Sequence, residues 1–262
     1  MPAMHYRWQR KRQNLRFILS EFGRTMRPQT PRLLRPVLGL LPALVFGGLY
    51  PNYFGIGKAM HAAVERSYLG FLDDFNAHLA QHAFLLGARP TIGDFGLIGP
   101  LYAHLYRDPA PGALMRQRAP NVARWVERMQ QPAEYTGPLL ADDTIPETLL
   151  PILARLLREQ MPVLTDTMRA VHAWCLDHPD THPLPRVIGR HRFQLEGQHS
   201  ERAIQPYAQW MFQRPARFYQ TLSDTERLTI DRQLARLDGF DALNTPIPTP
   251  LAFEHYRIVR AT

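Results

Sequence analysis

The chain has 262 residues, of which 45% are hydrophobic and 21% charged, and its formal net charge is +8. This composition excludes an intrinsically disordered protein, because there are enough apolar side chains to bury a sizeable core in one or two domains. The single cysteine, Cys175, excludes an intramolecular disulfide and a cysteine-based metal cluster, and it favours a reducing compartment such as the cytoplasm.

The first 35 residues carry the whole net charge. They hold nine basic side chains and one acid, Glu21, which leaves 22 basic and 22 acidic residues in the rest of the chain. Such a segment is typical of an arm that binds nucleic acid or an anionic membrane, and it resembles an organelle transit peptide. Apolar side chains also recur among these bases at helical spacing: Trp8, Leu15, Leu19 and Phe22. We therefore favour the solvated face of a first helix over residues 2–23, and we do not expect nucleic acid to be a partner.

Residues 36–57 contain no charge over 22 positions, which is long enough to span a bilayer. Three prolines and five glycines within this stretch would break a single spanning helix repeatedly. We predict a buried, irregular connection and no membrane span. The first residues lack an apolar run behind a short basic region, so no secretory signal is indicated.

A long amphipathic helix is predicted next, because apolar side chains recur at helical spacing from Met60 to Leu79. A short loop then leads to Thr91 and Asp94, whose spacing is that of a capping box with Asp in the usual Glu position. This box opens a nearly uncharged helix that extends to Tyr106, with a kink at Pro100. A helix that is apolar on all sides is expected to be central and buried.

The remaining elements follow in chain order. Residues 110–131 predict two short helices, the second beginning at Pro120, and a polar segment at 130–143 predicts a domain boundary. A helical stretch follows from 144 to about 177, interrupted at its two prolines. Beyond it the pattern predicts a loop with a short hairpin near 187–197, then helices between about 202 and 239 and an extended tail.

The run from Phe84 to Phe95, FLLGARPTIGDF, resembles the central signature of glutathione transferase C-terminal domains. The long helix before it (57–83) and the proline-started, tryptophan-bearing helix after it (119–125) occur in the order of that family. The opening residues 1–8 resemble the start of the first helix of this domain in a bacterial branch of the family.

The resemblance implies a fold and separate roles for the helical half and the thioredoxin-like half of the family's proteins. It implies an all-α protein, with a transferase-type helical bundle at 1–135 and a helical extension at 144–262 that resembles, more vaguely, an extension in some bacterial members. In the family a thioredoxin-like half binds glutathione through its strands, a cis-proline and a Glu-Ser pair. None of those positions is found in this sequence, so the resemblance describes a truncated transferase, and whether Met1 is the true start stays open.

In the family, the start of the first helix of this domain faces the glutathione sulfur and lines the pocket for a hydrophobic electrophile. The matching candidates for substrate binding are Met4, His5, Tyr6 and Trp8, and the alternative is ordinary packing of an aromatic first turn. His5 or Arg7 could stabilise a thiolate in principle. No catalytic residue is assigned, and glutathione is implied as a cofactor by the resemblance alone.

Other side chains suggest chemistry less specifically. Thr91 and Asp94 are accounted for by helix capping rather than catalysis. Five histidines between 172 and 199 lack the spacing of a known metal site, so no metal is expected. The aromatic and basic residues between 189 and 214 suit either an anionic ligand or an interface that docks the extension onto the bundle, and we favour the docking interface.

The sequence therefore predicts a glutathione transferase-like cytoplasmic protein that supplies the hydrophobic-substrate half of a conjugation site, with independent catalysis not expected. The predicted protein partner is a second copy or a separate thioredoxin-like domain, and the predicted ligand is a small hydrophobic electrophile. The alternative is a non-catalytic helical module for protein interaction.

Overall fold

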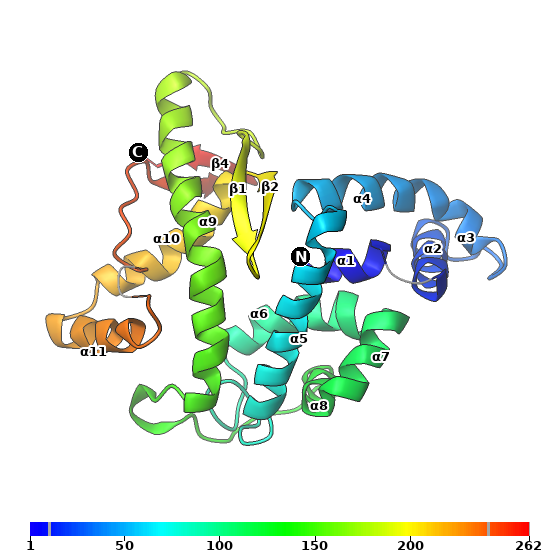
Figure 1. The fold of residues 1–262 in the computed structure, drawn as a ribbon, viewed down its shortest axis with the longest axis horizontal. Helices are drawn as coiled ribbons and strands as arrows, with labels where there is room; N and C mark the ends of the chain where they lie inside the picture. The colour runs from blue at the N-terminus through cyan, green and yellow to red at the C-terminus, as the bar shows by residue number, and fades with distance from the viewer. Residues whose placement is uncertain (10–11, 240–241, 262) are drawn as a thin grey trace. The chain divides into compact units, whose positions relative to one another are not determined.

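Figure 1 shows the computed structural model, which describes residues 1–9, 12–239 and 242–261. The chain divides into two units, the first comprising Met1–Ile152 with Leu195–Gln198, and the second Leu153–Gln194 with His199–Thr262. Most described residues are helical, but two two-stranded sheets are also present. The predicted all-α class is therefore correct only approximately.

Unit 1 is a helical bundle. Its helices are α1 (Pro2–Gln9), α2 (Arg12–Met26), α3 (Arg35–Leu38), α4 (Leu40–Tyr53), α5 (His61–His78), α6 (Ile92–Pro100), α7 (Pro109–Arg118) and α8 (Pro120–Met129). Short helical segments also occur at η1 (Lys58–Met60), η2 (Leu101–Tyr106), η3 (Ala141–Asp143) and η4 (Glu147–Leu149). Helix α1 packs against α2, α4, α5 and η2, so the N-terminal segment lies inside the bundle.

The core of unit 1 is built on the apolar stripe of α5. Its Val64, Leu72 and Phe75 are completely buried. Helix α8 places Trp125 against this stripe, with the Trp125 and Phe75 rings 5.2 Å apart and nearly perpendicular. Such edge-to-face pairs add to the free energy gained from burial alone. The long amphipathic helix of the sequence prediction thus forms one wall of the core.

The predicted helix from Phe95 to Tyr106 changes its winding at Pro100. Helix α6 ends there, and η2 continues as a π-helix in which Arg107 N–H donates to Tyr102 O at 3.1 Å. Proline lacks the amide that would continue an α-helical ladder, so the wider turn accommodates it. The expectation of a buried helix was wrong for α6, because Asp94 is its only buried residue and Phe95 is 62% exposed.

The uncharged stretch at 36–57 is not the buried, irregular connection that we predicted. It forms α3 and α4, and the outer side of α4 is exposed, with Leu41 70% and Leu44 65% accessible. The prolines at 36 and 42 lie near helix starts, where a missing amide costs little. Among the described residues, no helix combines the length and apolarity needed to cross a membrane.

Unit 2 holds most of the long helix α9 (Leu150–Asp177), with α10 (Pro206–Gln220) and α11 (Asp224–Ala235). Its strands are β1 (Arg190–Leu195), β2 (Gln198–Ala203), β3 (Leu251–Glu254) and β4 (Arg257–Arg260), with the turn between β1 and β2 grouped in unit 1. Helix α9 continues through Pro162 instead of being interrupted there. Its residues Val171 and Cys175 pack with Leu184, Leu251 and Ile258.

The predicted extended tail folds back as a hairpin. Strands β3 and β4 pair antiparallel with Leu251 opposite Arg260. The turn between them uses His255 and Tyr256, whose φ angles are 46° and 62°. Two-residue hairpin turns of this kind usually contain Asn and Gly, so the sequence carried no ordinary turn signal here.

Candidate functional site

A cavity of about 230 Å³ lies in unit 1 where α1, α2 and η2 meet. Its apolar wall comes from α2 and consists of Phe17, Ile18 and Phe22. Its charged and polar wall combines residues of α1 and α2 with residues of η2 and the two positions after it: Arg7, Glu21, Arg24, His104, Arg107 and Asp108. The cavity therefore offers an apolar surface opposite a set of guanidinium groups.

The floor of the cavity is fixed by Arg7 and Asp108. Arg7 donates from Nε to Asp108 Oδ2 and from Nη2 to Asp108 Oδ1, both at 2.8 Å, and also from Nη2 to Ala103 O at 3.1 Å. Asp108 is fully buried, whereas the Arg7 side chain is 16% exposed. A two-bond contact of this kind holds both side chains in one orientation. It ties α1 to the end of η2.

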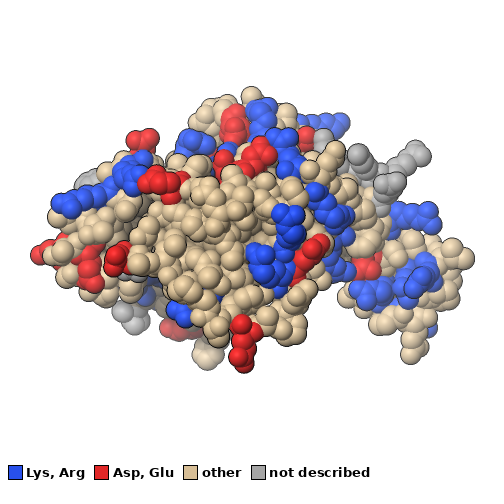
Figure 2. Space-filling view, turned by 90° about the horizontal axis from the view of Figure 1, so that it is seen from below, with Lys and Arg blue, Asp and Glu red and all other residues tan. Residues whose placement is uncertain are grey.

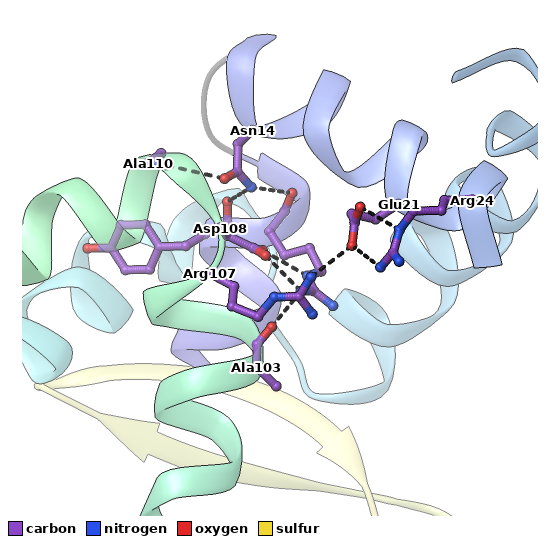
Figure 3. Close-up of polar contacts among 9 residues, drawn as sticks. Asn14, Glu21, Arg24, Ala103, Arg107, Asp108 and Ala110 are labelled. Carbon is purple, nitrogen blue, oxygen red and sulfur yellow. Dashed lines mark hydrogen bonds and ion pairs between the residues drawn. The ribbon is translucent and has the colours of Figure 1, made fainter. Parts of the chain in front are cut away.

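Asn14 of α2 completes this junction (Figure 3). Its Nδ2 donates to the main-chain oxygens of Tyr6 and Arg7 at 3.1 and 3.2 Å, and its Oδ1 accepts from Ala110 N–H at 3.3 Å. Asn14 is completely buried, so these bonds satisfy a polar group that would otherwise destabilise the fold. Three helical segments are thus linked by one amide.

The rim of the cavity holds a second charged group (Figure 3). Glu21 accepts from Nη2 of Arg107 and from Nη2 of Arg24, each at 2.8 Å. The hydrogen bond from Arg24 is the main cause that lowers the pKa of Glu21, and Arg107 acts in the same direction, so the carboxylate is charged near neutral pH. Three guanidinium groups then face two carboxylates, which leaves one positive charge for an anionic group.

His104 faces the same cavity from η2. Burial is the first cause that lowers its pKa, and the charge of Arg7 lowers it further. The imidazole is therefore neutral at pH 7. Its Nδ1 is buried and has no hydrogen-bond partner among the described residues.

The four residues predicted to bind substrate pack within the bundle. His5 and Tyr6 are each 1% exposed, and Met4 and Trp8 are half-buried. His5 Nε2 lies 2.9 Å from Glu65 Oε1, and the Tyr6 ring lies 5.3 Å from that of Tyr68.

Trp8 stacks on Phe22, a residue of the apolar wall, with the ring centroids 6.0 Å apart. Of the opening segment, only Arg7 is among the residues that line the cavity. The substrate role of Met4, His5, Tyr6 and Trp8 stays a prediction.

Asp94 has a structural role in the bundle. It accepts from Thr91 N–H at 2.9 Å and from the Thr91 hydroxyl at 3.0 Å, which forms the capping box at the start of α6. It also accepts from Leu85 N–H and from the Trp125 indole N–H, each at 3.2 Å. The Asp94 side chain is completely buried, and these four donors satisfy its two oxygens.

The histidines of unit 2 have separate contacts. His191 Nδ1 lies 2.7 Å from Asp166 Oδ2, and His172 Nδ1 lies 2.8 Å from Thr249 Oγ1. In the part of the chain that the structure describes, no three His, Cys, Asp or Glu side chains gather in a way that could hold a metal ion.

Trp210, one of the aromatic residues between 189 and 214, contacts β3 within unit 2. The Trp210 ring lies 4.9 Å from that of Phe253 on β3. The predicted docking of the extension onto the bundle stays a prediction.

Sequence reasoning missed the junction of Arg7, Asn14 and Asp108. The sequence offered one weak signal, since Asp108 precedes Pro109 at the start of α7. That position is usually occupied by a residue that caps its own helix, but the structure uses the carboxylate to bind Arg7 instead.

Unit 1 is a helical bundle with a cavity of about 230 Å³ beside its first helix. Residues 60–128 match the family model described as glutathione S-transferase, C-terminal domain. The matched segment is similar to that domain; it begins just before α5, ends within α8 and includes the η2 wall of the cavity. Searches of curated proteins and of solved structures gave no match.

Proposed function

We propose that this chain supplies the electrophile-binding half of a glutathione transferase-type site and that a thioredoxin-like domain supplies glutathione. The observation that carries the proposal is the match of residues 60–128 to the family domain. The cavity supports it, because His104, Arg107 and Asp108 belong to the matched segment. The proposed setting is the cytoplasm.

The composition of the cavity indicates how an electrophile would bind. Phe17 and Phe22 offer an apolar surface to an aromatic ring, and Arg107 and Arg24 offer guanidinium groups to an electron-rich substituent such as a nitro or carboxylate group. In the proposed reaction, the glutathione thiolate attacks the electrophilic carbon and forms a C–S bond, while the leaving group departs with its electron pair. This chain would orient the electrophile and exclude water, and the thiol would be activated elsewhere.

Isothermal titration calorimetry tests this proposal directly. The purified chain should bind chlorodinitrobenzene, an aromatic electrophile, and should show no heat of binding with glutathione alone. Phe22→Ala should weaken binding of the electrophile, because it removes part of the apolar wall. Leu157→Ala is the matched control, since Leu157 lines a different cavity in unit 2. Equal weakening by both variants, or no binding by the unmodified chain, would contradict the proposal.

A second candidate function is a non-catalytic module for protein interaction. It is favoured by the exposed apolar residues of α6, where Ile92 is 89% and Phe95 62% accessible. A second copy of the chain is the proposed partner for that face. Light scattering on a sizing column distinguishes this candidate, because Ile92→Ser with Phe95→Ser should convert a dimer to a monomer.

A further inference from the structure

Unit 1 exposes large apolar side chains along α3 and α4 that the proposed function does not use. We define the α3–α4 face by Leu33, Leu34, Val37, Leu41, Leu44 and Leu49, which are between 56% and 85% exposed. Large apolar side chains gathered at the surface of a folded protein mark interaction sites. The α3–α4 face therefore requires an apolar occupant.

Folding alone does not require these leucines. Helix α4 packs on the bundle through its opposite side, where Ala43 and Pro51 are buried and the Phe46 ring stacks on Phe22 at 5.7 Å. Positions 41, 44, 45 and 49 form one outward stripe at helical spacing. A polar residue at these positions would keep the helix and its inner contacts, so the apolar choice is explained by something outside the unit.

The segment of sequence that contains the α3–α4 face carries only positive charge. Residues 22–64 contain five bases and no acid. Arg27 and Arg32 are exposed, and neither guanidinium pairs with a carboxylate among the described residues. Figure 2 shows the end of unit 1 that carries α2 and α3 as mostly tan and blue. An anionic partner matches this charge.

Basic and apolar groups also share one hollow at the α3–α4 face. A cavity of about 500 Å³ is lined by Arg27 and Gln29 together with Leu34, Val37 and Leu38. Arg27 therefore lies directly beside the apolar surface. A ligand with an anionic group and an adjoining hydrocarbon chain satisfies both kinds of side chain, and a phospholipid has this construction.

We propose that the α3–α4 face docks on an anionic lipid bilayer, with the leucines in the acyl boundary and Arg27 and Arg32 at the headgroup phosphates. This is attachment at the membrane surface and does not involve a spanning helix. Apolar burial and attraction to anionic lipid act together in such binding. A protein or nucleic acid partner fits less well, because an acidic protein surface offers little apolar area and nucleic acid offers no apolar phase for the six exposed side chains.

Sedimentation with lipid vesicles tests the proposal on the full chain. The chain should sediment with vesicles of phosphatidylcholine mixed with phosphatidylserine, and much less with phosphatidylcholine alone. Raising the salt concentration from about 0.1 M to about 1 M should weaken the binding, since the Debye length falls from about 10 Å to about 3 Å.

Two double variants separate the contribution of the arginines to vesicle binding from that of the leucines. Arg27→Gln with Arg32→Gln should weaken binding to the mixed vesicles about twenty-fivefold, because each arginine near an anionic surface contributes about fivefold. Leu41→Gln with Leu44→Gln should weaken binding to both kinds of vesicle, and glutamine preserves the helix. Their circular dichroism and thermal midpoints should match those of the unmodified chain.

The matched controls lie in unit 2. Arg214→Gln with Arg217→Gln, and Leu156→Gln with Leu176→Gln, change exposed residues of the same types and should leave vesicle binding unchanged. Three results would overturn the proposal: no sedimentation with mixed vesicles, equal effects of test and control variants, or leucine variants that bind as the unmodified chain does. Loss of a dimer in the leucine variants without any vesicle binding would assign the face to self-association instead.

Discussion

Arg7 and Asp108 are 101 residues apart in the chain and are joined by two hydrogen bonds of 2.8 Å, with the carboxylate fully buried. The same pair of residue types occurs at the surface of the bundle, where Arg118 donates two hydrogen bonds to Asp73. The two pairs share their chemistry and differ in their exposure to water. Comparing substitutions in the two pairs therefore shows how much burial adds to the stability contributed by the Arg7–Asp108 pair.

Arg7→Ala should destabilise the protein by about 3 to 5 kcal/mol, because it leaves the Asp108 carboxylate buried without its partner. Arg118→Ala should change the free energy of unfolding very little, since water solvates Asp73 in its absence. Urea unfolding followed by circular dichroism measures both values. Similar losses from the two variants would show that the buried pair does not hold α1 to η2.

The contacts of Asp94 predict graded effects of two substitutions. Asp94→Ala should cost about 3 kcal/mol, because the buried N–H groups of Leu85 and Trp125 lose their acceptor. Thr91→Ala removes only a capping hydroxyl and should cost about 1 kcal/mol. Thermal unfolding of the two variants checks this order, and a larger loss from Thr91→Ala would be inconsistent with the geometry.

The stability of unit 1 should depend on the protonation of His78. Burial is the main cause that lowers the pKa of this imidazole from its ordinary value of 6.5, and its ring nitrogens lie 2.9 Å from Thr148 Oγ1 and 3.2 Å from Phe84 O. The unfolded chain therefore takes up the proton first as the pH falls. The stabilisation from neutral His78 is present above pH 6.5 and is lost as the pH falls through 6.5 toward the folded-state pKa.

His78→Gln should reduce this loss of stability between about pH 7.5 and pH 5.5, because glutamine does not titrate. His199→Gln changes an exposed histidine and serves as the control. The midpoints of urea unfolding, measured across this pH range, give the slope of stability against pH. An unchanged slope in His78→Gln would assign the pH dependence to other groups, among them His104, whose pKa is also lowered by burial.

The rate at which the Cys175 thiol is alkylated measures how well the core of unit 2 covers it. It is 6% exposed, and burial raises the pKa of its thiol, so both the access and the thiolate needed for alkylation are reduced. Iodoacetamide should modify the native chain orders of magnitude more slowly than the chain in guanidinium. Leu251→Ala removes a completely buried neighbour in β3 and should accelerate the reaction.

The labelling has two simple checks. Cys175→Ser should abolish modification, because the chain has no other cysteine. Fast labelling of the native chain would mean that the β3–β4 hairpin does not cover this thiol in solution.

The sequence alone predicted those parts of the bundle that depend on local patterns. The stripe of α5, the Thr91–Asp94 cap and the proline at the start of α8 are each defined within one or two helical turns. The exposure of α4 and α6 was missed, because an apolar composition indicates that a helix needs a partner but does not say whether this chain provides it.

The cavity could not be predicted for a different reason. Arg7, Asn14 and Asp108 are joined by contacts between segments about 100 residues apart. Local sequence patterns do not predict contacts over such a separation. The family resemblance directed attention to the first helix and identified Met4, His5, Tyr6 and Trp8. It named Arg7 only as a residue that could stabilise a thiolate and gave no reason to expect its pairing with Asp108.

The most direct test of the central claim is an NMR titration of the isotope-labelled chain with dinitrophenyl glutathione. The account predicts chemical-shift changes concentrated at Phe17, Phe22 and His104, and no changes when glutathione is added alone. Changes confined to the unit 2 cavity around Arg158 and Arg169, or equal changes with glutathione alone, would contradict the assignment of an electrophile site to the bundle.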